Sequence, residues 1–249
     1  MIVSKYISSA KTWANAALAF VYPENCQLCG ENRATPAHGY VCERCRATVR
    51  FLEPPFCERC GLPFEGAITS AFECGNCKEL TLHFHSARSA VAATEKILES
   101  IHRYKYQHAL WVEPFLAGLL IERAKPEIAK ANWHAIVPVP LHSTKLRERE
   151  FNQAERLARC LSPAVGIPVN TNLVRRVQPT RTQTLLSREE RLANVRNAFA
   201  VNDGVDLCGQ MLILIDDVMT TGATTSACAR VLRQAGAEKV CVWTVARGT

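Results

Sequence analysis

Four C-x-x-C pairs in the first third of the chain constrain its fold more than any other feature of the sequence. In each half of this segment, one pair is followed by another after twelve or thirteen residues. Secreted disulfide scaffolds are smaller and rarely repeat this spacing, whereas regular cysteine pairs are typical of tetrahedral zinc ligation. The sequence therefore predicts two structural Zn2+ ions, with these ligands: Cys26, Cys29, Cys42, Cys45, Cys57, Cys60, Cys74 and Cys77.

The two quartets of cysteines have nearly identical spacing, which favours two consecutive zinc ribbons with one ion each. A cross-braced arrangement, in which the first pair shares an ion with the third, is the alternative. A redox dithiol would explain one such pair but not four. Gly30 and Gly61 directly follow their pairs, where a left-handed backbone is often needed. Four sulfur ligands leave no open position for water, so we expect a structural role and folding that depends on the metal.

The sequence divides into three parts. Residues 1–22 are expected to form a short helix that packs on the body or presents an apolar face to a partner. Its apolar run is interrupted by Asn15, lacks a cleavage motif and is too short to span a bilayer. We therefore expect a cytoplasmic protein, with contact between this helix and a membrane surface as the alternative. Residues 23–82 form the zinc-binding module, and residues 83–249 form the remaining domain.

From residue 83 onward, apolar segments alternate between strand and helix patterns. Strands are predicted at residues 87–94, 135–140, 211–216 and 239–247. Helices are predicted at residues 95–110, 114–124, 151–162 and 223–237. Residues 173–201 are polar and basic, which indicates a long loop with a short helix. Strands that alternate with helices predict an α/β fold with a parallel sheet flanked by helices.

The formal net charge is +7, but two Zn2+ ions bound by eight thiolates would lower it to +3. Global basicity therefore gives little support for a nucleic acid partner. Local clustering gives more, because residues 141–200 hold eleven Lys and Arg against five acidic residues. Such a concentration of positive charge, in a segment expected to form loops, attracts phosphates.

The stretch MLILIDDVMTTGAT places two carboxylates directly after the most apolar segment of the chain. Side chains alternate along a strand, so Asp216 and Asp217 can face one ligand only if the strand ends there. Backbone N–H groups at the start of the following helix form an anion site, and the hydroxyls of Thr220, Thr221 and Thr224 add donors. The carboxylates suit vicinal hydroxyls, or a cation held by them. A diol beside a phosphate describes a ribose phosphate, and the Walker A pattern is absent from the sequence.

This stretch resembles the phosphoribosyl-pyrophosphate (PRPP) signature of type I phosphoribosyltransferases. The resemblance implies that Asp216 and Asp217 contact the ribose hydroxyls of PRPP bound with Mg2+. It also implies a type I phosphoribosyltransferase-like parallel sheet for residues 83–249. The 5-phosphate would lie on a loop of five residues: Thr220, Thr221, Gly222, Ala223 and Thr224.

The segments VPVPLHSTKLREREFNQAERLA and RTQTLLSREERLANVRNAF, with the cysteine pairs, resemble the ComF family of competence proteins, which includes the GntX-like proteins. This family is linked to natural transformation, which implies single-stranded DNA and a helicase-like ATPase as partners. Its members usually have glycine where this chain has Glu150, in the loop that would hold pyrophosphate, and a carboxylate there opposes close approach. Basic residues predicted to contact pyrophosphate or DNA are Lys145, Arg147, Arg149, Arg175, Arg176 and Arg181.

Two hypotheses for the function stay open. In the first, the chain is a phosphoribosyltransferase in which residues 175–191 close over PRPP as a lid, although no residue stands out as a general base and the acceptor is not indicated. In the second, the chain is a non-catalytic module that binds single-stranded DNA and a helicase through the same fold. Tyr104, Tyr106 and Trp111 offer rings for base stacking, unless they form one face of a core helix.

Overall fold

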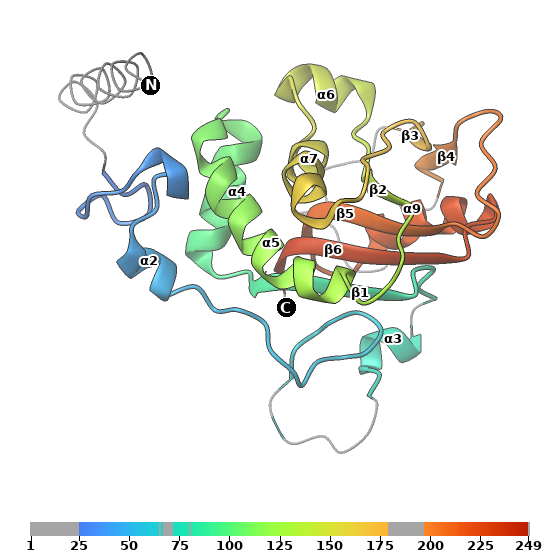
Figure 1. Ribbon diagram of the computed structural model, residues 1–249, viewed down its shortest axis with the longest axis horizontal. Coiled ribbons are helices and arrows are strands. Elements are labelled where there is room, and N and C mark those ends of the chain that lie inside the picture. The colour runs from blue at the N-terminus through green and yellow to red at the C-terminus, as the bar shows by residue number, and fades with distance from the viewer. Residues whose placement is uncertain (1–24, 65, 67–71, 80, 179–196, 249) are drawn as a thin grey trace, which may run out of the picture.

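The computed structural model of the chain describes residues 25–64, 66, 72–79, 81–178 and 197–248 (Figure 1). The helix predicted for residues 1–22 lies outside the described residues. Arg181 and most of the segment predicted to close over the ligand also lie outside them. Among the helices that are described, none is both long and apolar enough to cross a bilayer.

Four strands form the central sheet: β1 (Ser86–Ala92), β2 (Ala135–Pro138), β5 (Met211–Met219) and β6 (Lys239–Arg247). Their order across the sheet is β1-β6-β5-β2, and every neighbouring pair is parallel. The predicted parallel α/β sheet is therefore confirmed. β5, which carries the two aspartates, lies in the interior of the sheet between β6 and β2 (Figure 1).

The strand that carries the aspartates is longer than predicted. Its ladder with β6 continues past Asp216, with Val218 opposite Ala246 and Met219 opposite Arg247. The predicted end of this strand at residue 216 is therefore wrong. Both aspartates lie within the strand, because backbone pairing with β6 continues beyond the apolar run.

Four long helices cover the two faces of the sheet: α4 (Glu95–Tyr106), α5 (Glu113–Ile128), α7 (Gln153–Val165) and α9 (Ala223–Gln234). The side-chain alternation of β5 divides the core between them. Ile213 and Ile215 pack with residues of α4, α5 and α7, whereas Leu212 and Leu214 pack with residues of α9. All four helices lie where helices are predicted, although α4 ends at Tyr106, and the short helix η2 (Leu110–Val112) follows it.

Two segments predicted as loops have regular structure. The first is α6 (Ser143–Arg149), in which the His142 side chain accepts a hydrogen bond from the Thr144 N–H at 3.3 Å. It is helical because its sequence, STKLRER, is rich in strong helix formers. The second consists of β3 (Val174–Arg176) and β4 (Phe199–Val201), which pair antiparallel. These strands form because each buries an apolar side chain in the core beside α9.

The cysteine-rich segment contains three short helices: η1 (Pro36–His38), α2 (Glu43–Ala47) and α3 (Gly75–Glu79). We call residues 25–45 the first ribbon and residues 56–77 the second ribbon. Cysteines of the first ribbon pack in the core with α5, and cysteines of the second pack in the core with α9. The two ribbons therefore contribute to opposite faces of the sheet. Gly30 and Gly61 have positive φ angles of 70° and 65°, as their positions predict.

Candidate functional site

The eight paired cysteines gather as two consecutive quartets, as their spacing favours, and not in the cross-braced alternative: Cys26, Cys29, Cys42 and Cys45, then Cys57, Cys60, Cys74 and Cys77. Within each quartet, the sulfur atoms all lie within 4.8 Å of one another. Backbone N–H groups of Asn32 and Glu31 lower the pKa of Cys29 to about 6. Burial and the neighbouring sulfurs raise the pKa of Cys45 to about 12. Four thiolates can therefore gather only around a cation, and the sulfur tetrads fit tetrahedral Zn2+.

The two aspartates lie near the carboxyl end of β5, which is where parallel sheets bind ligands. Asp216 is 9% exposed and Asp217 is 3% exposed. Asp217 forms a close ion pair with Lys105 of α4. The Asp216 carboxyl lies within hydrogen-bonding reach of Asp217, and its charge also acts on the buried Cys228 of α9 and on Arg176 of β3. The pair is therefore contacted by elements from both faces of the sheet.

The two carboxyl groups have opposite electrostatic environments. Burial, followed by repulsion from Asp217, raises the pKa of Asp216 well above its usual range. Burial would also raise the pKa of Asp217, but the ammonium group of Lys105 outweighs burial and the net shift is downward. Asp217 is therefore the charged member of the pair, and Asp216 is the member that can hold a proton. Charged Asp217 can only accept hydrogen bonds, whereas protonated Asp216 can also donate one. This combination suits the hydroxyls of a sugar, which both donate and accept.

The residues after β5 turn sharply into α9. Gly222 is the N-cap residue, with a φ of 79°. A Cβ at this position would lie 3.0 Å from Met219 Cε and 3.5 Å from the Phe84 ring, so another residue would be strained by the positive φ and would crowd Met219. Thr221 Oγ1 accepts the Ala223 N–H at 3.3 Å, which closes the turn that precedes the helix. The start of α9 is the positive end of its dipole, which favours a phosphate. The three loop threonines at this turn are exposed or half-buried: Thr220, Thr221 and Thr224.

Three of the six predicted basic residues converge beside the aspartates. Burial, and then the charges of Arg176 and Arg149, lower the pKa of Lys145, and Lys105 acts in the same direction. Arg149 is only 7% exposed, and its guanidinium donates to Gln153 Oε1 at 2.5 Å. α4, α6 and β3 therefore bring four cations together, which we call the basic cluster: Lys105, Lys145, Arg149 and Arg176.

The other three predicted basic residues have different surroundings. Arg147 is exposed on α6. Arg175 donates to the Val201 carbonyl at 3.2 Å and to Asn202 Oδ1 at 3.0 Å, so it joins β3 to β4. Arg181 lies outside the described residues.

Sequence reasoning missed two charged residues of the site. Lys105 had no specific signal, because a lysine in the last turn of an amphipathic helix is common. Arg247 is 2% exposed at the end of β6, and its guanidinium donates to the carbonyl oxygens of Met219 and Thr220. The sequence did contain a signal for Arg247, because it is a charged residue at the end of a nine-residue, mostly apolar strand.

Glu150, which stands where the ComF pattern has glycine, ends α6 in the left-handed region with a φ of 64°. Glycine reaches this conformation without strain, which explains the preference for it. The Glu150 side chain is 78% exposed, and its Oε2 lies 3.8 Å from Nε2 of His108. Glutamate in place of glycine at position 150 therefore strains the backbone and also adds a negative charge.

The three aromatic residues near α4 divide between core and surface. Tyr104 is fully buried, and its hydroxyl donates to Glu113 Oε2 at 2.5 Å. Tyr106 is 55% exposed and Trp111 is 47% exposed. The expectation of a core helix face therefore holds for Tyr104, whereas the other two rings are accessible at the surface.

A parallel sheet flanked by helices, preceded by two cysteine quartets, gives the chain the predicted fold class, a phosphoribosyltransferase-like α/β fold with a zinc-ribbon module. The double zinc ribbon domain family matches residues 17–78, which include both cysteine quartets. A purine phosphoribosyltransferase from Pyrococcus horikoshii is similar in structure, with a TM-score of 0.34 and 15% identity over 53% of this chain and 83% of that one. This likeness is too distant to bear on the site.

Relatives narrow the class to a family. Competence protein F of Haemophilus influenzae is 33% identical over 227 residues, which cover 89% of this chain and 96% of the relative. The DNA utilization protein YhgH of Salmonella typhimurium is 31% identical over 90% of this chain and 97% of its own length. The chain therefore belongs to the competence protein F (ComF) family.

Proposed function

We propose that the chain binds a ribose 5-phosphate compound, either PRPP with Mg2+ or a related nucleotide, at the carboxyl end of β5. The observation that carries this proposal is the meeting of three groups there: the aspartate pair, the glycine turn into α9, and the basic cluster. The aspartates would take the ribose hydroxyls. The start of α9 would take the 5-phosphate, and the basic cluster would take the pyrophosphate.

The ion pair between Lys105 and Asp217 has to change when such a ligand binds. A ribose hydroxyl at Asp217 would share that carboxylate with the ammonium group, and a pyrophosphate would offer the same ammonium group an anionic partner. Mg2+ bound with PRPP would neutralise part of the phosphate charge. Turnover would also require an acceptor for the ribosyl group, which the site residues do not identify, so the proposal concerns binding.

Calorimetric titration of PRPP with Mg2+ into zinc-loaded protein tests this proposal. We expect a Kd of about 1–100 µM, with no measurable binding in the Asp216→Ala, Asp217→Ala double variant. Asp203→Ala is the matched control, because it removes an exposed aspartate outside the site. Absence of binding to the intact protein, or equal binding to the double variant, would reject the proposal.

The names of the relatives refer to competence and DNA utilization. We therefore propose that this chain also acts in DNA uptake or use, in the cytoplasm, in contact with single-stranded DNA and a helicase-like ATPase. The ribose-phosphate site would then bind a nucleotide precursor or breakdown product, and the protein surface would bind DNA.

Direct binding of single-stranded DNA is a second candidate function, and Tyr106 favours it. The Tyr106 ring is 55% exposed, and the Arg149 guanidinium lies 4.9 Å from the ring centroid. An exposed ring beside a cation is a platform on which bases stack. Fluorescence anisotropy with a labelled oligothymidylate should show salt-dependent binding that is about fivefold or more weaker in Tyr106→Ala. Leu98→Ala, another exposed apolar side chain on α4, should bind normally. Equal binding by both variants would argue against the platform.

A further inference from the structure

Arg247, at the end of β6, connects the second ribbon to the loop that follows the aspartates. Its Nη1 donates to the carbonyl oxygens of Met219 at 3.1 Å, of Thr220, and of Gly248 at 2.8 Å. Its Nη2 lies 3.7 Å from Sγ of Cys60. One buried guanidinium therefore contacts both a predicted zinc ligand and the backbone on which the 5-phosphate would lie.

The charge of this guanidinium requires a nearby anion. Arg247 is 2% exposed, and among the described residues it has no ion pair with a carboxylate. A buried charge without a partner is strongly destabilising. When Zn2+ is bound, Cys60 is a thiolate, and a four-cysteine zinc site carries a net charge of about −2. The metal-loaded quartet is therefore the counter-charge that the buried arginine lacks.

Packing links the second ribbon to the same loop. Leu82 and Phe84, which lie between the second ribbon and β1, pack in one core with Met219 and Ala223. The Phe84 ring lies 3.5 Å from the position of a Cβ on Gly222. These contacts leave the loop little room to move while the ribbon is in place.

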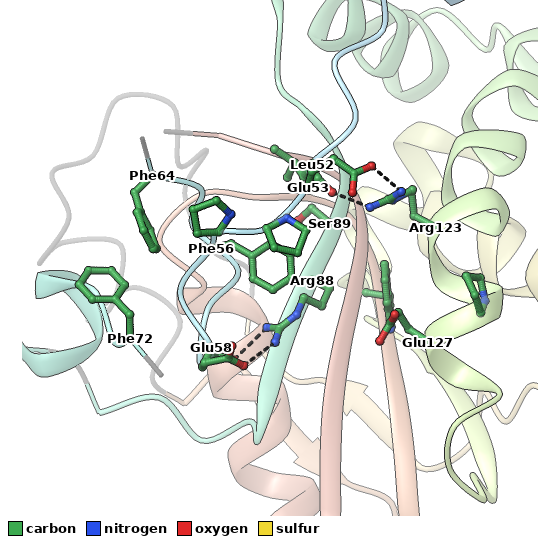
Figure 2. A pocket seen from close by; sticks show the side chains of 14 residues that line it. Leu52, Glu53, Phe56, Glu58, Phe64, Phe72, Arg88, Ser89, Arg123 and Glu127 are labelled. Atoms are coloured by element: carbon green, nitrogen blue, oxygen red, sulfur yellow. Dashed lines mark hydrogen bonds and ion pairs between the residues drawn. The ribbon is translucent and has the colours of Figure 1, made fainter. Parts of the chain in front are cut away.

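The second ribbon is itself fixed to the sheet at its edge strand β1. The Ala87 N–H donates to the Arg59 carbonyl at 2.8 Å, between the two cysteines of one pair. Beside it lies a cleft of about 620 Å3, which contains none of the predicted site residues. Figure 2 shows two ion pairs among the residues that line this cleft, from Arg88 to Glu58 and from Arg123 to Glu53. Movement of the second ribbon would therefore be transmitted to the sheet and to the loop.

The first ribbon is attached to different elements, the helices on the other face of the sheet. Its cysteines belong to the other core, with α5. Arg103 of α4 donates to the Gln27 carbonyl of this ribbon at 3.0 Å, and Arg46, directly after the ribbon, pairs with Glu122 on the surface of α5 at 2.5 Å. The two ribbons, although similar in sequence, thus have different relations to the candidate site.

We propose that the second zinc ribbon forms part of the ribose-phosphate site, and that Arg247 is the positioning residue through which it acts. Metal bound by the second quartet balances the charge of Arg247, and Arg247 holds the Met219–Gly222 loop in its binding conformation. The first ribbon has a structural role only. This inference rests on the proposed function where it concerns ligand affinity, but not where it concerns the conformation of the loop.

The first test compares Arg247→Gln with Arg46→Gln, which also removes an arginine between a ribbon and the domain. Amide hydrogen exchange reports on the loop without a ligand. We expect exchange of the Met219–Ala223 amides to be about tenfold or more faster in Arg247→Gln and unchanged in Arg46→Gln. Calorimetry should show PRPP affinity about tenfold lower in the first variant only. Unchanged loop exchange in a folded Arg247→Gln variant would overturn the inference.

The second test keeps Arg247 and disturbs one metal site at a time. Cys29 and Cys77 are matched, because each is the half-buried ligand of its quartet. Cys77→Ser should loosen the Met219–Ala223 amides and weaken PRPP binding, whereas Cys29→Ser should leave that loop protected. Equal effects of the two variants, or a protected loop in Cys77→Ser after loss of zinc, would overturn the inference. If the intact protein does not bind PRPP, the proposed function fails, and the exchange data still decide the role of Arg247.

Discussion

At the scale of single residues, Asp216 and Asp217 show how a strand can hold two carboxyl groups in one buried place. Lys105 pairs with Asp217 and lowers its pKa, whereas at Asp216 burial and repulsion from Asp217 outweigh the attraction of Lys105 and the pKa rises. The charged form of Asp216 is therefore costly in the folded protein. In return, the protonated carboxyl group of Asp216 can donate a hydrogen bond to a ligand as well as accept one.

The substitution Asp216→Asn should stabilise the protein at alkaline pH while abolishing ligand binding. The folded pKa of Asp216 lies near 8, above its unfolded value, so its contribution to stability is full below about pH 4 and is lost as pH rises toward 8. The variant avoids this loss. We expect its advantage in the free energy of unfolding to be on the order of 1–3 kcal/mol at about pH 8.5 and clearly smaller at about pH 6. Urea unfolding at both pH values measures it.

Asp203→Asn is the control for this pH dependence, because Asp203 is exposed and its neutralisation should have little effect at either pH. An advantage of Asp216→Asn that is equal at the two pH values would show that burial of its charge is not the cause.

Glu150→Gly should stabilise the chain by about 0.5–1 kcal/mol, because glycine adopts the left-handed conformation at the end of α6 without strain. Thermal unfolding measures this change. Glu148→Gly is the matched control, since it places glycine inside the same helix and should destabilise the chain by up to about 1 kcal/mol. Destabilisation by both substitutions would mean that the Glu150 contacts outweigh the backbone strain.

At the scale of elements, the sequence predicted the apolar strands and long helices well, because their patterns are local. It did not predict β3 or β4, which lie in a polar segment whose structure depends on packing beside α9. It also missed α6, although the helix formers of this segment are a local signal. Nor could it predict the length of β5, which is set by pairing with β6. The same limit applies to the candidate site. Asp216, Asp217 and Gly222 belong to one local motif, whereas Lys105 and Arg247 come from distant elements.

Residues of α4, α6 and β3 form the basic cluster, which predicts that this cluster contacts the pyrophosphate of PRPP and not its 5-phosphate. Lys145→Met should lower the affinity for PRPP by about tenfold and the affinity for ribose 5-phosphate much less, because the cluster would contact the pyrophosphate. Competition binding with both ligands measures the difference. Arg147→Met on the same helix is the control, because Arg147 is exposed outside the cluster. Equal losses for the two ligands would assign Lys145 to the 5-phosphate instead.

At the scale of the whole molecule, two ribbons of similar sequence contribute to opposite faces of one sheet. Each quartet contributes buried cysteines to the hydrophobic core on its face of the sheet. The packing of both faces should therefore depend on bound metal. Removal of zinc by a chelator should therefore lower the Tm by about 10 °C or more, and metal analysis should give about two zinc ions per chain. Recovery of the Tm on addition of zinc is the control. An unchanged Tm after complete loss of zinc would contradict this role.

The most direct test of the central claim is a crystal structure of the zinc-loaded protein with PRPP and Mg2+. We expect the ribose hydroxyls at Asp216 and Asp217, with Lys105 turned toward the pyrophosphate. We expect the 5-phosphate on the loop from Thr220 to Thr224. A ligand bound elsewhere, such as in the cleft beside Phe56 (Figure 2), with the Lys105–Asp217 ion pair intact, would reject the proposed site.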